Sequence, residues 1–253
     1  MYELTPLFIS LLLSTGLVAG VINVLAGGGS NLTLPALMVM GLPADVANGT
    51  NRVGVMLQTL VGLRGFDQGG KLDRSDMWAI LVPTLLGGLV GSVIASYLPT
   101  TLLKPTLLLT MITLSVIMIV KPAMVIPGPD ETAYRLKDRP WAWFGLFGTG
   151  IYGGFVQAGV GFLLIASLAG GLRYDLIRAN GLKLLCTAFF TIAALAVFIW
   201  RGQVAWVPGL VLGVGTMIGA RLGVKLALNV SQQAMKWFLL LMTLAASAAA
   251  IWL

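Results

Sequence analysis

Histidine is absent from this 253-residue chain, and Asp, Glu, Lys and Arg together make up only 10% of it. The lack of histidine excludes Ser-His-Asp and Cys-His catalysis, and also His-ligated metals and haem. The single cysteine, Cys186, lies in an apolar run, so it is expected to be a small buried hydrophobe rather than half of a disulfide. A typical soluble domain has about 25% charged residues. The composition therefore nearly excludes a soluble globular protein.

Hydrophobic residues and glycine are abundant instead, at 58% of the chain and 32 glycines. The 16 basic residues exceed the 9 acidic ones and give a formal net charge of +7. Because the basic residues are scattered, this excess favours the cytoplasmic loops of a multi-pass membrane protein over a nucleic-acid-binding surface. The start Met1-Tyr2-Glu3 lacks the basic region of a cleaved signal peptide, so we expect none. We expect neither a metal ion nor a cofactor.

The apolar segments predict an all-α, polytopic transmembrane bundle with eight long and two short membrane segments. The short segments have about 12 residues and reach about 18 Å as helix, less than the hydrocarbon core of roughly 30 Å. The long segments are 4–26, 46–66, 77–97, 102–121, 141–158, 178–200, 205–228 and 233–253, and the short ones are 31–42 and 162–172.

An internal repeat divides the chain into two similar halves. When the sequence is shifted by 132 residues, 23 of the 100 positions from Gly16 to Ser115 are identical, whereas chance would give roughly a tenth. The matches include Ala47-Asn48-Gly49 with Ala179-Asn180-Gly181. We expect a first membrane repeat at 1–121, a cytoplasmic linker at 122–140 and a second membrane repeat at 141–253.

The relative orientation of the repeats depends on whether the short segments cross the membrane. Ten crossings give inverted repeats, and eight give parallel ones. The ten-crossing arrangement places eleven basic residues on one side and two on the other, whereas eight crossings divide the same residues 8 to 5. The positive-inside rule therefore favours inverted repeats with both termini outside. The eleven are Arg64, Lys71, Arg74, Lys121, Arg135, Lys137, Arg139, Arg173, Arg178, Lys225 and Lys236, and the two are Lys104 and Arg201.

The polar groups expected inside the membrane are mostly hydrogen-bond donors. All nine acidic residues lie near segment ends or in loops, where Asp45 and Asp175 are expected to cap helices. Helices broken at glycines expose backbone N–H groups at the start of the next half-helix, which suits an anion. Broken helices at matching places in two repeats indicate a transporter's central site. The candidate binding residues are Gly27, Gly28, Gly29, Ser30, Asn48, Thr50, Asn51, Arg52, Gln157, Gly159, Gly161, Asn180 and Lys183, and Gln58 is a further intramembrane polar group.

Each of these features also has an interpretation without a ligand. The glycine clusters can let helices pack closely, which is the favoured interpretation of the Gly87/Gly91 and Gly219/Gly223 pairs. The cations Arg52 and Lys183 can extend to a membrane interface. The amides Asn48 and Asn180 can cap helices or bond to neighbouring helices.

These motifs resemble a known family. The pattern Gly-x3-Gly-x6-Gly-Gly-Gly from Gly16, then Pro35, Gly41 and Ala47-Asn-Gly-Thr-Asn-Arg, is similar to the first repeat of the TauE/SafE sulfite-exporter family. The segment from Gly145 to Gly161, followed by Ala179-Asn-Gly-Leu-Lys, is similar to its second half. The resemblance implies a bacterial-type inner-membrane transporter of small sulfur-containing anions such as sulfite and organosulfonates. The second half departs from the family pattern at two places, so we expect an asymmetric site. Gly159-Val160-Gly161 lacks a full glycine triplet, and the second departure is Leu182-Lys183.

We therefore expect a non-enzymatic exporter with one anion site between the repeats. In this hypothesis the glycine N–H groups and the asparagines hold the anion, and Arg52 and Lys183 set the charge preference. The lack of intramembrane carboxylates agrees with export that needs no coupling ion. Two alternatives remain open: a cation-coupled importer, with a sodium site that includes Thr50 and Ser30, and an anion channel. An oligomer is compatible with the sequence, which does not specify it.

Overall fold

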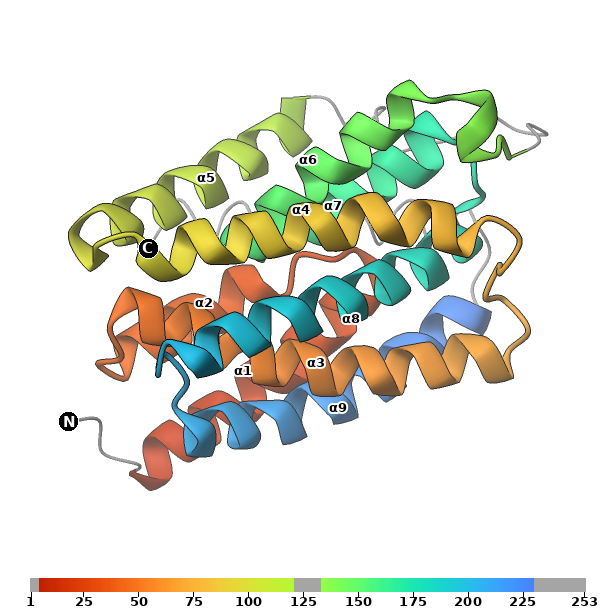
Figure 1. Ribbon diagram of the computed structural model, residues 1–253. Helices are drawn as coiled ribbons and strands as arrows, with labels where there is room; N and C mark the ends of the chain where they lie inside the picture. Colours follow the sequence, from red (N-terminus) through yellow and green to blue (C-terminus); the bar gives the residue numbers. More distant parts are fainter. Residues whose placement is uncertain (1–4, 121–132, 230–253) are drawn as a thin grey trace.

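The computed structural model describes residues 5–120 and 133–229, and the regular structure in these ranges is helical (Figure 1). Four helices, α1, α4, α8 and α9, are long and apolar enough to cross a membrane. The predicted all-α membrane fold is thereby confirmed, whereas the segment 233–253, Lys121, Lys236 and most of the linker lie outside the described residues. The helices are α1 (Pro6–Leu25), α2 (Ser30–Val39), α3 (Ala44–Gln68), α4 (Met77–Tyr97), α5 (Thr100–Val120), α6 (Trp141–Phe155), α7 (Val160–Ile165), α8 (Leu176–Trp200) and α9 (Trp206–Asn229), with the short helices η2 (Leu136–Asp138) and η3 (Ala166–Gly171).

The two short segments turn back instead of crossing the bundle. In Figure 1, α1 runs inward from the left-hand end and α2 returns to that end, whereas α6 runs inward from the right and α7 with η3 returns there. The chain reverses at Gly27 and Gly159, whose φ values are +93° and +75°. Glycine adopts this region without the Cβ clash that other residues meet. A ten-residue α2 reaches only about 15 Å, so α1 with α2, and α6 with α7 and η3, form two hairpins that enter the bundle from opposite ends.

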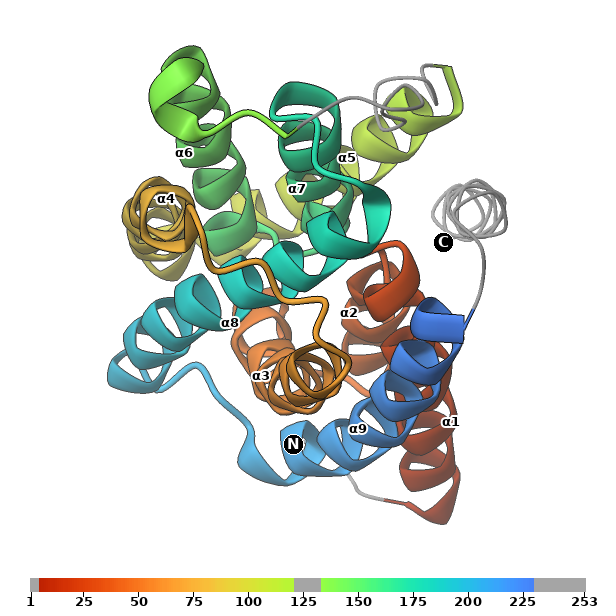
Figure 2. The same cartoon turned by 90° about the vertical axis from the view of Figure 1, so that its right-hand side faces the viewer.

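The long helices pack around a central pair, and their main contacts join one half of the chain to the other. Helices α3 and α8 contact each other in the interior, between the pair α1 and α9 and the pair α4 and α6 (Figure 2). Helix α9 also packs on α3, and α4 packs on α8. Helices from the N-terminal half therefore take their main partners from the C-terminal half, so neither half forms a bundle by itself.

Glycines allow the paired helices to approach backbone to backbone. A Cβ atom at Gly87 or Gly91 of α4 would lie 2.1 or 2.0 Å from the carbonyl oxygen of Phe147 or Ile151 in α6. A Cβ atom at Gly219 of α9 would lie 2.0 Å from the carbonyl oxygen of Leu17 in α1. Real side chains cannot come so close, so the expected packing role of these glycines is confirmed.

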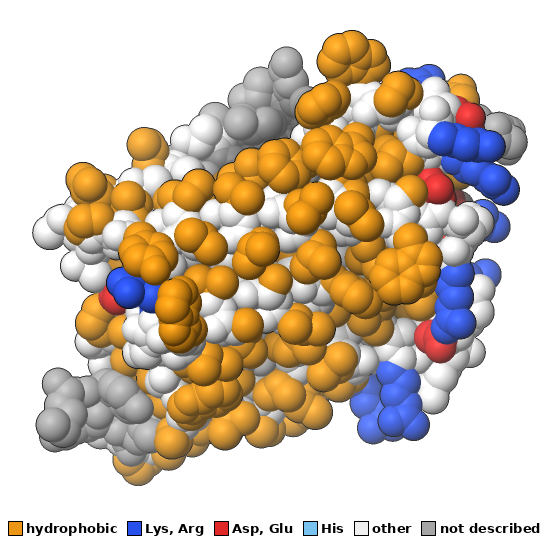
Figure 3. Space-filling view, viewed as in Figure 1, with side chains coloured by type: hydrophobic (Ala, Val, Ile, Leu, Met, Phe, Trp, Pro, Cys, Tyr) orange, Lys and Arg blue, Asp and Glu red, His pale blue; other side chains and the backbone are white. Residues whose placement is uncertain are grey.

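The face of the bundle drawn in Figure 3 is largely apolar, and most of its Lys and Arg side chains gather at the right-hand end. Exposed aromatic residues lie near both ends, with Trp78 and Trp141 at the basic end and Trp200 and Trp206 at the other. Tryptophans are enriched at both membrane–water interfaces, and positive charge is enriched in cytoplasmic loops. The surface is therefore that of a multi-pass membrane protein whose basic side chains gather at one end.

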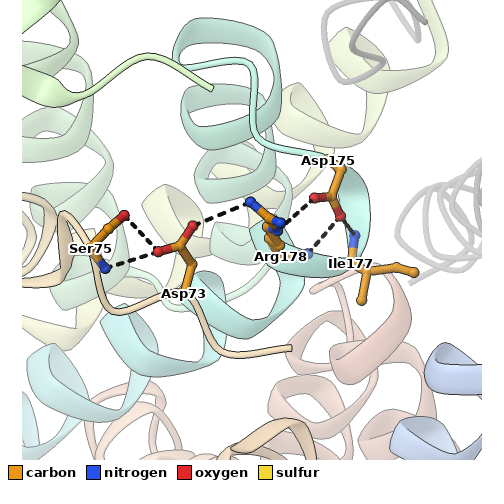
Figure 4. A network of polar contacts seen from close by, with 5 residues as sticks. All are labelled: Asp73, Ser75, Asp175, Ile177 and Arg178. Atoms are coloured by element: carbon orange, nitrogen blue, oxygen red, sulfur yellow. Dashed lines mark hydrogen bonds and ion pairs between the residues drawn. The ribbon is translucent and has the colours of Figure 1, made fainter. Parts of the chain in front are cut away.

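A polar network joins the α3–α4 loop to the start of α8 at the basic end (Figure 4). The carboxylate of Asp175 accepts hydrogen bonds from the backbone N–H groups of Ile177 and Arg178, so its predicted capping role is confirmed. Arg178 forms ion pairs with Asp175 at 3.2 Å and with Asp73 at 3.6 Å. The capping prediction for Asp45 is wrong, because α3 begins after Pro43 without a side-chain cap.

We expect Asp73→Asn to destabilise the protein by less than about 1 kcal/mol at pH 7, because half-exposed ion pairs contribute little. Burial raises the pKa of Asp73, but two hydrogen bonds from Ser75 and the charge of Arg178 outweigh it, so the net pKa is lowered. A lowered pKa in the folded state stabilises above the ordinary value of about 3.9 and is lost as the pH falls through the folded value. Thermal unfolding in detergent over a series from pH 7 downward tests this, since the difference between parent and variant should shrink as the pH falls below the ordinary value. A difference that grows as the pH falls would contradict it.

Candidate functional site

The two helix breaks meet at the centre of the bundle. The backbone N–H of Gly161 donates to the carbonyl oxygen of Gly27 at 3.2 Å. A Cβ atom at Gly27 would lie 2.3 Å from the Cα of Gly161, so only glycines permit this contact. The candidate glycines Gly27 and Gly161 are therefore brought together from opposite halves, as the turn after α1 crosses the turn before α7.

Arg52 of α3 is fully buried and binds the end of α6. Its guanidinium donates to the carbonyl oxygens of Gly153 at 2.6 Å and Gly154 at 2.7 Å, and also to Oε1 of Gln157. Asn48, one turn earlier, donates from Nδ2 to the carbonyl oxygen of Phe155 at 2.9 Å. The last carbonyls of a helix have no partner within the helix and carry partial negative charge. Arg52 and Asn48 supply both the donors and the charge that this helix end requires.

Lys183 of α8 binds the end of α1 in the same manner. Its Nζ donates to the carbonyl oxygens of Asn23 at 2.7 Å and Val24 at 2.9 Å, and to Oδ1 of Asn180 at 2.6 Å. Asn180 in turn donates to the carbonyl oxygen of Leu176 at 3.0 Å. Each half therefore provides the cation that caps the broken helix of the other half, and neither cation extends to a membrane interface.

Other candidate residues connect α3 to its neighbours. Thr33 donates to Oδ1 of Asn51 at 2.6 Å, and Nδ2 of Asn51 donates to Oγ of Ser30 at 3.2 Å, which ties α2 to α3. The hydroxyl of Thr50 accepts from the backbone N–H of Ala205 at 2.9 Å, just before α9. These side chains have partners within the protein.

The remaining glycines serve the helix breaks. The backbone N–H of Gly29 donates to Oδ1 of Asn23 at 2.8 Å. A Cβ atom at Gly28 would lie 2.5 Å from the ring of Phe162, so the aromatic ring covers this glycine. Gly159 forms the left-handed turn that starts α7.

A small cavity lies where the two breaks meet the central helices. Four of the candidate residues line it: Gly27, Gln157, Gly161 and Lys183. The other candidates do not line it but position the segments that do. The cavity is completed by six residues that were not in the candidate set: Asn23, Gln58, Thr59, Val160, Leu184 and Thr187.

The missed lining residues follow helical spacing from residues that were recognised. Thr187 lies one turn after Lys183, and Asn23 lies four residues before Gly27. Gln58 was recognised as an intramembrane polar residue, and its Oε1 is buried without a hydrogen-bond partner. The unpaired oxygen can only accept a hydrogen bond, whereas the N–H groups on Nε2 of the same amide are the donors that an anion in the cavity would bind.

The charges at the centre are of one sign. Among the described residues, Arg52 and Lys183 are the charged side chains in the buried set, and no buried carboxylate accompanies them. Burying a charge costs free energy unless it is paired. The backbone carbonyls offset part of this cost, but they carry no full negative charge. The centre is therefore suited to an anion, with amides and hydroxyls to orient it.

Comparisons with known proteins agree with this architecture. A family model described as "Sulfite exporter TauE/SafE" matches residues 12–250. A "Probable membrane transporter protein" of Haemophilus influenzae is 27% identical over 224 residues, which cover 87% of this chain and 86% of the relative. The "Probable membrane transporter protein YfcA" of Escherichia coli K12 is 26% identical over 248 residues, which cover 98% and 91%. The "Probable membrane transporter protein ORF9" of a Sinorhizobium species is 22% identical over 245 residues, which cover 97% and 93%.

Proposed function

The chain belongs to the sulfite exporter TauE/SafE family, and from this membership we propose that it exports a small sulfur-containing anion, sulfite or an organosulfonate, across a bacterial-type inner membrane. The observation that carries the proposal is a pair of buried cations with no buried carboxylate among the described residues: Lys183 lines the cavity, and Arg52 donates to Gln157 in its wall. An anion in this cavity would supply the missing negative charge.

The anion is held by groups from both halves. Lys183 supplies positive charge, and the amides of Gln58, Gln157 and Asn23 supply oriented donors. The hydroxyls of Thr59 and Thr187 complete the polar wall. Gly27 and Gly161 keep the backbone close to the ligand because they have no side chain. Arg52, Asn48, Asn51 and Asn180 hold the broken helices in place around it.

The two halves are inverted repeats that move against each other. Three pairs of residues with positive φ support the repeat, because each pair is separated by 132 positions: Gly27 with Gly159, Gly41 with Arg173, and Gly70 with Gly202. The hairpin of α1 and α2 enters from one end of the bundle and that of α6 and α7 from the other, which supports inversion (Figure 1). In transporters built from inverted repeats, rocking of the repeats exposes a central site to each side in turn.

The membrane potential drives export. With the basic end in the cytoplasm, an inside-negative potential expels anions with about 2.3 kcal/mol per charge for each 100 mV, and a divalent anion gains about twice as much. Such a driving force removes the need for an intramembrane carboxylate to couple transport to a proton.

Efflux from proteoliposomes tests the proposal. Vesicles are loaded with sulfite, sulfate, thiosulfate or a short organosulfonate, and release is followed with and without an imposed potential. We expect sulfite or an organosulfonate to leave faster than from protein-free vesicles, and faster still when the potential is negative inside. Equal release of every anion from vesicles with and without the protein would overturn the proposal.

We expect Gln58→Leu to slow efflux about tenfold or more, because a hydrogen bond to a charged group contributes about 1.5–3 kcal/mol. The fold should persist, since Oε1 of Gln58 has no protein partner to lose. Gln68→Leu is the matched control, because Gln68 is exposed at the end of the same helix. Efflux rates and thermal melting are measured on both variants. If Gln58→Leu transports as fast as Gln68→Leu, the anion does not contact Gln58.

A further inference from the structure

A second polar cluster lies at the end of the bundle opposite the basic end. Three segments meet there: the start of α3, the end of α4 and the loop between α8 and α9. Nε2 of Gln203, in that loop, donates to Oδ2 of Asp45 at 3.2 Å and to the carbonyl oxygen of Ser96 at 3.1 Å. The cluster therefore joins the first half of the chain to the second, at a distance from the central cavity.

The orientation of the Gln203 amide follows from its two acceptors. If nitrogen and oxygen were exchanged, Oε1 would face both the carboxylate and the Ser96 carbonyl, and neither can donate a hydrogen bond. With Nε2 in place, Oε1 is left buried without a partner. Oδ1 of Asp45 is also buried without a partner. Gln203 is 9% exposed, so its carbonyl oxygen cannot be satisfied by bulk water.

Residues 5–120 and 133–229 do not supply the missing partner. Asp45 forms no ion pair within the part of the chain that the structure describes. The other charged side chains described at this end are Arg201, which stacks over the ring of Tyr97 at 4.3 Å, and Lys104 in the first turns of α5. A buried acceptor without a donor costs about 1–3 kcal/mol. Two such acceptors lie on side chains that are hydrogen-bonded to each other.

The internal repeat does not reproduce this polar cluster in the other half of the chain. The positions 132 residues away from Asp45 and Gln203 are Ile177 and Lys71, which cannot form the same pair. Asp45 does not cap α3 either. Neither the repeat nor helix capping therefore accounts for the carboxylate and the amide at these two positions.

We propose that Asp45 and Gln203 bind one small cation, Na⁺, through Oδ1 of Asp45 and Oε1 of Gln203. Hard oxygen ligands suit Na⁺, and the cation supplies the positive partner that both acceptors lack. The site is independent of the proposed anion specificity. An occupied site would hold the start of α3, which also carries Arg52 and Gln58, against the loop before α9.

Thermal unfolding in detergent tests the site without any transport assay. The parent is melted in NaCl and in choline chloride of equal ionic strength at fixed pH. We expect Tm to rise by about 2–4 °C when Na⁺ exceeds its Kd several-fold. A response to sodium at fixed pH and ionic strength identifies Na⁺.

Two variants assign the response to this cluster. Asp45→Asn removes the charge and places an N–H donor next to Gln203, so it should fold and lose the cation response. Asp175→Asn is the matched control, because it removes a carboxylate from the start of α8 at the opposite end and should keep the response. A parent whose Tm does not respond to sodium, or an Asp45→Asn variant that responds like the parent, would overturn the site. Anion efflux does not enter either outcome, so failure of the proposed substrate remains distinguishable.

Discussion

Replacing Arg52 with methionine is expected to destabilise the folded protein by about 3 kcal/mol or more. The substitution leaves the carbonyl oxygens of Gly153 and Gly154 and Oε1 of Gln157 buried without their donor. Each unsatisfied buried acceptor costs about 1–3 kcal/mol, and little water reaches this position to replace the guanidinium. The end of α6 would then move, and the cavity wall formed by Gln157 with it. Unfolding in mixed detergent–SDS micelles measures the loss.

Two further variants make this result specific to the buried contacts. Arg64→Met removes an exposed arginine from the same helix and should change stability by no more than about 0.5 kcal/mol. Arg52→Lys keeps the charge but loses the planar fork that reaches adjacent carbonyls, so it should fall between the parent and Arg52→Met. If Arg52→Met is as stable as Arg64→Met, the guanidinium does not hold the end of α6.

Gly27→Ala is expected to cost about 2–5 kcal/mol, because it combines backbone strain with a steric clash. The φ of Gly27 is +93°, and its added Cβ would meet the Cα of Gly161 at 2.3 Å. Separation of the two helix breaks would remove their shared hydrogen bond and widen or close the cavity. We therefore expect efflux to be lost together with stability, as measured on the same purified variant.

Substitutions at two other glycines separate the cost of backbone strain from the cost of the steric clash. Gly41 has a φ of +91°, but a Cβ atom added there would meet no atom within 4 Å, so Gly41→Ala should cost only the strain, about 1–2 kcal/mol. Gly161→Ala has the clash with the Cα of Gly27, again at 2.3 Å, without a positive φ. The two costs should add up roughly to that of Gly27→Ala. A Gly27→Ala variant no less stable than Gly41→Ala would show that the breaks do not need to touch.

These two substitutions act on the same feature, the exchange of contacts between the halves at the centre of the bundle. Arg52 and Lys183 cap helix ends of the opposite half, and the turns at Gly27 and Gly161 cross. Any movement of one half against the other must therefore either break these contacts or move the bonded segments together. Their donors and acceptors are the part of the molecule most directly coupled to the cavity.

Much of the fold could be predicted from the sequence, because a membrane helix is a local property. A run of about 20 apolar residues is enough to span the hydrocarbon core, and its ends fall at polar, proline or glycine residues. The predicted segments 77–97, 178–200 and 205–228 accordingly agree with α4, α8 and α9 to within two residues at each end. The glycine clusters also marked both helix breaks correctly.

The residues that line the cavity could be identified from the sequence only in part. Gly27, Gln157, Gly161 and Lys183 line the cavity, whereas Asn23, Thr59 and Thr187 gave no signal beyond being polar residues near apolar runs. Helical spacing from Lys183 would have found Thr187. No local sequence pattern shows that Arg52 donates to the carbonyl oxygens of Gly153 and Gly154, which follow it by 101 and 102 residues.

The sequence by itself determined the class of protein, the positions of the long helices, the sign of charge in the interior and the end of the molecule that is basic. These properties depend on residue type and run length, through the free energy of transfer into lipid. Only the tertiary structure decided that the short segments turn back and that Arg52 and Lys183 bind helix ends of the opposite half. Both depend on which helices pack together, and packing is specified by backbone contacts at glycines between residues far apart in the sequence, such as Gly87 with Phe147 and Gly219 with Leu17, not by any local pattern.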